Sequence, residues 1–427
     1  MTIRILPADE AAKKAKERVA EWKKEQKLQS KPKPEPKKPK VQARKAKPEP
    51  EKQPEPKKES SLAQEPQRTS KQLEYDRHLL QAIKENKTEE IARYIAEGAS
   101  VNVADKDGPA LFRVSSTMAL EILIEYGVDL NVKDPRNTSA LIYFIERGKE
   151  ELVVVLLENG ADPDVSDPKG DTPLMIAIDS QRNKAAETIV AAGANIDTKN
   201  DRGETALMKA CESSNPFTKD IVELLIEKKA DVNARDKDSW TVLMHAAKGY
   251  INLEILIDAG ADVNAAAKDG KTALMNAASH DEGSRILLER GAAVNAKDRS
   301  GRTALMFASE NWRKEGIVDV LVNAGANVNE SSLNGMTALM YAICQKNSNV
   351  FTDLLKHGAD VNAVDEQGNT PLIHAAIKGE KGMIEKLLEK GANANARAND
   401  GFTPLRHAIR SGKGECVELL RKHGGVK

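Results

Sequence analysis

Short apolar segments recur along the chain from about Leu73 to its end, and polar residues separate them at regular intervals. Each unit reads D-x-x-G-x-T-A-L-M-x-A and then continues into an apolar stretch that ends in L-L-x-x-G-A-x-V-N. Apolar residues three and four positions apart line one face of a helix, so each unit predicts two short helices. The position of the final glycine returns after 29 to 36 residues, most often after 33. It falls at Gly98, Gly127, Gly160, Gly193, Lys229, Gly260, Gly291, Gly325, Gly358, Gly391 and Gly424.

Each position of the unit has its own physical explanation. A threonine hydroxyl can cap the first helix, which we expect at Thr172, Thr272 and Thr303. A proline in the first helical turn loses no hydrogen bond. The glycine after the second helix suits a left-handed residue that ends a helix. Paired leucines near the end of the second helix are expected to form the core between units: Leu156/Leu157, Leu224/Leu225, Leu287/Leu288, Leu354/Leu355, Leu387/Leu388 and Leu419/Leu420.

The period of 33 residues and the T-P-L-x-x-A motif resemble the ankyrin-repeat family. The motif is nearly intact in GDTPLMIA (170–177), GKTALMNA (270–277), GRTALMFA (301–308), GMTALMYA (335–342), GNTPLIHA (368–375) and GFTPLRHA (401–408). The resemblance covers about 355 of the 427 residues. It implies an all-α ankyrin-repeat solenoid with short hairpin loops over residues 73–427, in about eleven repeats. The T-A-L-M form of the motif is similar to that of bacterial ankyrin proteins.

The first 72 residues do not follow this pattern. Ala12, Ala15, Val19 and Trp22 fall on one face of a short charged helix, which we predict within residues 1–30. Residues 31–72 are rich in proline, lysine and glutamate and offer little to bury. They predict a disordered, extended linker.

Charge divides the chain in the same place. Residues 1–72 carry 21 basic and 11 acidic side chains, whereas the remainder carries an excess of ten acidic ones. The basic arm leaves an alternative function open, as an adaptor for nucleic acid or an anionic surface. The chain has three distant cysteines, no apolar stretch long enough to span a membrane and no secretory signal, which together predict a cytoplasmic protein. We expect it to be a monomer. Export by a route that reads no such signal stays open.

The sequence contains no motif that is typical of a catalytic centre. We find no P-loop, GxSxG or HExxH, so we expect neither enzyme activity nor a cofactor. His245, His374 and His407 share one position of the unit, but neighbouring units should hold them too far apart to bind one metal ion. The cysteines are expected to pack as small apolar residues.

The resemblance implies that a protein partner would bind the turn tips and the concave face of the first helices. The tip residue between glycine and threonine is expected to be exposed: Asp171, Glu204, Trp240, Lys271, Arg302, Met336, Asn369 and Phe402. Aromatic and methionine side chains are favoured as interface anchors. Phe307 and Tyr341, with Met336 nearby, form the best candidate for an interface centre. Trp312, in the loop that follows, either borders them or packs locally. The predicted partner-binding residues are Trp240, Phe307, Met336, Tyr341, His374, Phe402 and His407.

Overall fold

The computed structural model describes residues 69–212, 218–249, 251–310 and 316–426. These residues divide into two compact units, unit 1 up to Leu130 and unit 2 from Asn131 onward, and each is considered by itself. The helix predicted within residues 1–30, nearly all of the linker predicted at 31–72, and Trp312 lie outside the described residues.

Unit 1 contains a pair of α-helices, a hairpin of two strands with two residues each, and a second helix pair whose first member is only a 3₁₀ helix. Its first helix is α2 (Ser70–Lys84), which Thr69 and Gln72 cap reciprocally. After α3 (Thr88–Ala96) come the antiparallel strands β1 (Ala104–Asp105) and β2 (Gly108–Pro109). The second pair joins the 3₁₀ helix η1 (Ala110–Arg113) to α4 (Thr117–Glu125). The prediction of two α-helices in every unit is therefore wrong here, because this short unit has room for only one 3₁₀ turn.

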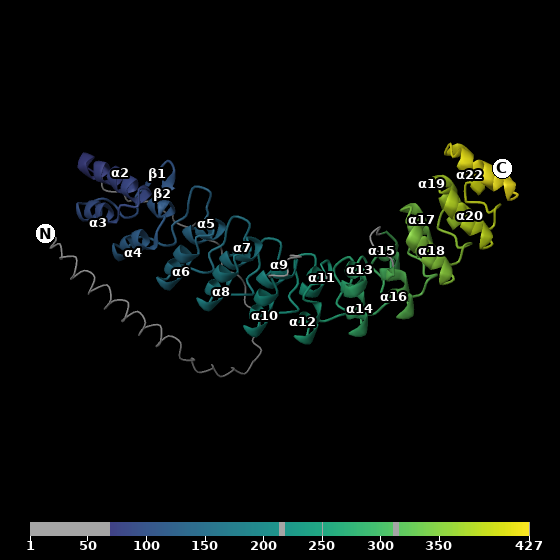
Figure 1. The fold of residues 1–427 in the computed structure, drawn as a ribbon, viewed down its shortest axis with the longest axis horizontal. Helices are drawn as coiled ribbons and strands as arrows, with labels where there is room; N and C mark the ends of the chain where they lie inside the picture. The colour runs from purple at the N-terminus through teal and green to yellow at the C-terminus, as the bar shows by residue number, and fades with distance from the viewer. Residues whose placement is uncertain (1–68, 213–217, 250, 311–315, 427) are drawn as a thin grey trace, which may run out of the picture. The chain divides into compact units, whose positions relative to one another are not determined.

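Unit 2 consists of nine helix pairs along its described residues (Figure 1). Helices that open a pair are here called first helices, and those that close it second helices. The first helices are α5 (Ala140–Glu146), α7 (Pro173–Asp179), α9 (Ala206–Glu212), α11 (Val242–Ala247), α13 (Ala273–Ala277), α15 (Ala304–Glu310), α17 (Ala338–Cys344), α19 (Pro371–Lys378) and α21 (Pro404–Arg410). The second helices are α6 (Glu150–Glu158), α8 (Asn183–Ala191), α10 (Lys219–Glu227), α12 (Leu253–Asp258), α14 (Asp281–Glu289), α16 (Ile317–Asn323), α18 (Ser348–Lys356), α20 (Lys381–Glu389) and α22 (Gly414–Lys422).

The core of unit 2 runs between successive pairs. Each first helix packs against the next first helix, so that these helices form one row and the second helices form another (Figure 1). The residue four positions before the glycine of each unit has no exposed surface: Leu156, Ile189, Leu225, Leu256, Leu287, Leu321, Leu354, Leu387 and Leu420. One helix pair cannot cover its own apolar face, so burial requires a neighbour on each side.

The structure tests two of the three predicted threonine caps, with opposite results. The Thr172 hydroxyl accepts a hydrogen bond from the Met175 N–H at 3.4 Å, which confirms the predicted cap. Thr272 makes no such bond, so that cap was predicted wrongly. Pro173, Pro371 and Pro404 open their helices as predicted. The helix starts are thus fixed by local hydrogen bonds and by proline, which places the side chains that follow in one register.

The turns between pairs bond to one another through the backbone. The Leu333 N–H donates to the Ser300 carbonyl at 2.8 Å, and the Glu366 N–H donates to the Asn334 carbonyl at 3.1 Å. Equivalent bonds join the other turns from Lys169 to Asn399. Gly335 makes this approach possible, because it has a φ of 75° and an added Cβ would lie 2.7 Å from the Asp365 Cα.

Asparagine side chains link the ends of the second helices. Asn329 donates through Nδ2 to the Gly358 carbonyl at 3.2 Å and accepts from the Asp360 N–H at 2.7 Å. Five other asparagines do the same with the following pair: Asn233, Asn264, Asn295, Asn362 and Asn395. Asp164 and Asp197 accept the equivalent backbone N–H. As carboxylates they have no proton to donate.

Lys229 is the one residue in the glycine series with a side chain, and it adopts a φ of 70°. Replacing Lys229 by glycine should therefore raise the free energy of unfolding by about 1 kcal/mol, because a left-handed backbone strains any residue with a Cβ. Urea unfolding followed by circular dichroism would measure the change. Lys228 has a φ of −77°, so Lys228→Gly is a matched control that should gain nothing. An equal gain in both variants would contradict this explanation.

Candidate functional site

An aspartate opens five of the turns of unit 2 and organises the surface above the first helices there: Asp134, Asp167, Asp236, Asp298 and Asp365. Asp365 Oδ1 accepts the Gln367 N–H at 3.0 Å and the Asn369 N–H at 2.7 Å. Asp236 holds the Asp238 and Trp240 N–H groups in the same way, at 2.9 and 2.8 Å. One carboxylate oxygen therefore closes the turn, and the other oxygen is left to bond a side chain.

The tip residues lie closer to the protein than predicted. They were expected to be exposed, but Asp171 and Glu204 are buried and the others are half-buried. The cause for these two carboxylates is the polar contacts that they make within the protein. Asp171 Oδ1 lies 3.3 Å from the Lys209 Nζ, and Asn200 Nδ2 donates to Glu204 Oε2 at 2.9 Å. These two carboxylates are thereby part of a buried ion-pair network.

Aromatic side chains on this face are covered by cations from neighbouring positions. The Lys248 Nζ lies 4.7 Å from the Trp240 ring centre, and the Arg302 guanidinium lies 4.0 Å from that of Phe307. The Arg406 guanidinium lies 4.0 Å from the ring centre of Phe402. Each ring is half-buried and keeps an apolar face beside a charged group.

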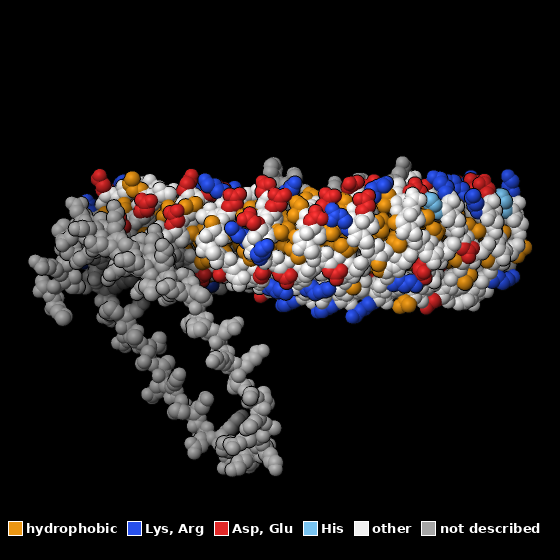
Figure 2. Space-filling model, turned by 90° about the horizontal axis from the view of Figure 1, so that it is seen from below, with side chains coloured by type: hydrophobic (Ala, Val, Ile, Leu, Met, Phe, Trp, Pro, Cys, Tyr) orange, Lys and Arg blue, Asp and Glu red, His pale blue; other side chains and the backbone are white. Residues whose placement is uncertain are grey.

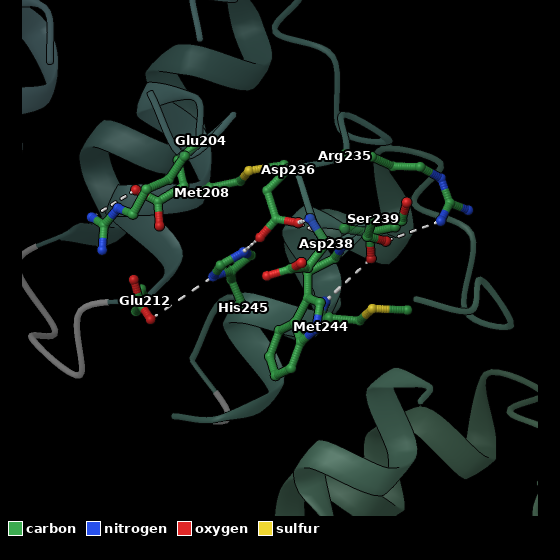
Figure 3. Close-up of polar contacts among 12 residues, drawn as sticks. Glu204, Met208, Glu212, Arg235, Asp236, Asp238, Ser239, Met244 and His245 are labelled. Carbon is green, nitrogen blue, oxygen red and sulfur yellow. Dashed lines mark hydrogen bonds and ion pairs between the residues drawn. The ribbon is translucent and has the colours of Figure 1, made fainter. Parts of the chain in front are cut away.

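His245 lies between two carboxylates that come from different pairs (Figure 3). Its Nε2 is 3.2 Å from Asp236 Oδ2, and its Nδ1 is 3.9 Å from Glu212 Oε1. His245 and the Lys248 ammonium, whose Nζ is 2.8 Å from Glu212 Oε1, lower the pKa of Glu212 to about 2 against the opposing effect of burial. Glu212 therefore remains charged down to strongly acidic pH.

The position that faces the neighbouring histidine was not recognised in the sequence. In three cases the last residue of a first helix contacts a residue in the middle of the next first helix. That residue lies four positions after the threonine that precedes the next first helix. Three contacts have this register: Asp179 with Lys209 at 2.7 Å, Glu212 with His245, and Cys344 Sγ with His374 Nδ1 at 3.7 Å. These partners are 30 to 33 positions apart in the sequence, and only the stacking of successive first helices brings them together.

The remaining predicted residues lie on the same face of unit 2. Tyr341, His374 and His407 stand four positions after the threonine, and Met336 is a turn tip. Tyr341 and Met336 are half-buried. His374 Nε2 lies 2.8 Å from Asp365 Oδ2. His407 is buried, burial lowers its pKa, and its Nε2 lies 3.7 Å from Asp400 Oδ1.

The cysteines do not all pack as predicted. Cys211 and Cys416 are buried, and burial raises the pKa of both thiols. Cys344 is half-buried instead, because it ends a first helix at the surface register rather than at a core position.

The first-helix face is hollowed only shallowly. A cavity of about 510 Å³ lies beside α19 and α21, and its lining includes Asn369, Ile377, Asp400, His407 and Arg410. Figure 2 shows lysine and arginine side chains at the C-terminal end of unit 2 and also along the lower edge of its middle part. Among the described residues, no group of three or more histidine, cysteine or acidic side chains is arranged to hold a metal ion. No helix in that part of the chain is long and apolar enough to cross a membrane.

Comparison with known families identifies the repeating pair. A family model described as ankyrin repeats, in three copies, matches residues 110–200, 184–267, 251–332, 300–365 and 339–427. The chain belongs to the ankyrin-repeat family. Ankyrin repeats are in general modules for protein–protein interaction. None of the curated proteins compared with this ankyrin chain matches it.

Proposed function

We propose that the first-helix face of unit 2 binds a protein partner, with Trp240, Phe307, Met336, Tyr341, His374, Phe402 and His407 as contact residues. The observation that carries this proposal is the row of half-buried aromatic rings beside cations. Such a ring offers a large apolar area at low cost in conformational entropy. Residues of this kind dominate binding energy at protein interfaces.

The spacing of these residues favours an extended partner surface over a small ligand. Trp240, Phe307 and Phe402 come from three different repeats, those that contain α11, α15 and α21. The cavity beside α19 and α21 is open and partly polar. Small-molecule sites are usually enclosed and mostly apolar. The array would thus serve as a scaffold that holds one macromolecule along several repeats.

Affinity capture with a triple variant tests the proposed face. Trp240→Ala, Met336→Ala and Phe402→Ala together should abolish recovery of a partner that the wild type retains, because anchors at three separate points are removed. The matched control is Ile286→Ala, Val322→Ala and Leu388→Ala, three half-buried apolar residues on second helices. Circular dichroism would check that both variants remain folded. Recovery that is equal with the two variants would refute the assignment.

A salt titration of the captured complex tests the alternative function of the basic arm. Binding through phosphate groups to the excess positive charge of residues 1–72 would weaken steeply as salt rises. Binding through the aromatic face should weaken little. Loss of binding on deletion of residues 1–68, with the triple variant unaffected, would favour the adaptor over the scaffold.

We also propose that the protein acts in a reducing, cytoplasm-like compartment as a monomer. The support is that all three cysteines are free in the structure. The T-A-L-M form of the motif supports a bacterial-type ankyrin protein.

A further inference from the structure

Cys344, His374 and Asp365 form a chain of contacts that joins two repeats. Cys344 ends α17, His374 lies in the middle of α19, and Asp365 opens the turn before α19. Cys344 Sγ is 3.7 Å from His374 Nδ1, and His374 Nε2 is 2.8 Å from Asp365 Oδ2. The order of groups is thiol, imidazole and carboxylate, the same order that activates a nucleophile in acyl-transfer enzymes.

The hydrogen bonds around Asp365 fix which nitrogen of His374 carries the proton. Oδ1 accepts two backbone N–H groups, and Oδ2 accepts the Asn369 Nδ2 donor at 3.1 Å. Three donors already point at its two oxygens, so Asp365 acts as an acceptor toward His374 as well. The proton of neutral His374 therefore sits on Nε2. Its Nδ1 keeps a free lone pair, which faces the Cys344 sulfur.

The site differs from its counterpart four repeats earlier in one chemical respect. His245 faces Glu212 at the register where His374 faces Cys344. A histidine between two carboxylates is held by charge on both sides. His374 faces a carboxylate only at Nε2, where Asp365 lies, and its Nδ1 faces the Cys344 thiol, which can give up a proton.

Cys344 is also the accessible thiol of the three. Cys211 and Cys416 are 1% and 2% exposed, whereas Cys344 is half-buried on the first-helix face. Burial raises the pKa of the Cys344 thiol, and Lys378 opposes that rise. The resting sulfur is therefore protonated, so a nearby base is needed when it reacts.

We propose that Cys344 is a modification site at which His374 acts as the base, and that it takes small disulfides. In the reaction the Cys344 S–H gives its proton to His374 Nδ1 while the sulfur bonds to one sulfur of the disulfide. The S–S bond of the disulfide breaks, and the other half leaves as a thiolate. That thiolate takes the proton from His374, which leaves a mixed disulfide on Cys344 and a free small thiol.

Timed reaction of the full chain with hydroxyethyl disulfide, followed by peptide mass spectrometry, tests the site. Cys344 should be modified first, while Cys211 and Cys416 stay unmodified and serve as internal controls. Equal rates at all three thiols would overturn the proposal without the need for any variant.

Replacement of His374 by asparagine tests whether His374 acts as a base toward Cys344 or only shields its sulfur from the reagent. Asn276 already occupies this register in α13, so the substitution uses a side chain that the array accommodates. Loss of the base should slow modification of Cys344 by about tenfold or more. If His374 only shields the sulfur, the smaller asparagine would leave the rate unchanged or raise it, and the proposal fails. His245→Asn makes the same change at α11 and should leave the rate at Cys344 unchanged; slowing there too would also count against a specific base.

Discussion

Replacement of Phe351 by alanine is expected to lower the free energy of unfolding by about 3–5 kcal/mol. Phe351 lies in α18, is 1% exposed and is among the largest fully buried side chains of the described residues. Alanine would remove the ring and leave a cavity that the flanking helices α16 and α17 can fill only in part. Urea unfolding monitored by circular dichroism would give the change.

Leu333 provides the control for Phe351. It is a large apolar residue of a neighbouring turn, but it is 70% exposed, so Leu333→Ala should change stability by no more than about 0.5 kcal/mol. Similar losses in the two variants would mean that the core does not lie between successive helix pairs as described.

Gly335→Ala is expected to destabilise unit 2 by about 2–4 kcal/mol. Two costs combine at this position. The left-handed φ of 75° strains alanine, and its Cβ would collide with the backbone of the next turn at 2.7 Å, where no flexible side chain can move aside. The same unfolding measurement applies.

Substitution of Gly401 measures the cost of the left-handed backbone without the cost of the collision. Its φ is 76°, but no atom of a following turn lies within 4 Å of an added Cβ, because Gly401 belongs to the last repeat. Gly401→Ala should therefore lose only about 1 kcal/mol, the conformational part. If Gly401→Ala proves as damaging as Gly335→Ala, close packing of the turns contributes nothing.

The repeat pattern predicts the architecture well because it is set by local chemistry. Thr172 and Pro173 define a helix start without reference to the rest of the chain, and the glycine series defines where the second helices end. Even Lys229, which breaks the series in sequence, keeps its left-handed backbone. The short second repeat was misjudged, because the motif does not tell whether four missing residues shorten a loop or reduce a helix to η1.

The details of the candidate site depended on distances between repeats, which no linear pattern contains. The sequence predicts Trp240 to be an exposed turn tip, yet Lys248 and His245 from its own repeat lie against the ring. Cys344 and His374 are 30 positions apart, and they meet only because successive first helices stack. A comparison of the last residue of one first helix with the variable residue of the next would have revealed such pairs.

The asparagine links have a consequence for how this protein can change in length. Asn295, Asn329 and Asn362 each join the glycine carbonyl and the backbone N–H of the pair that follows. Excision of residues 329–361 would bring Asn362 directly into the place of Asn329, with every donor and acceptor matched again. A coding sequence of this kind can gain or lose whole segments in frame and still encode a continuous fold, so evolution can adjust the reach of the surface without redesigning its joints.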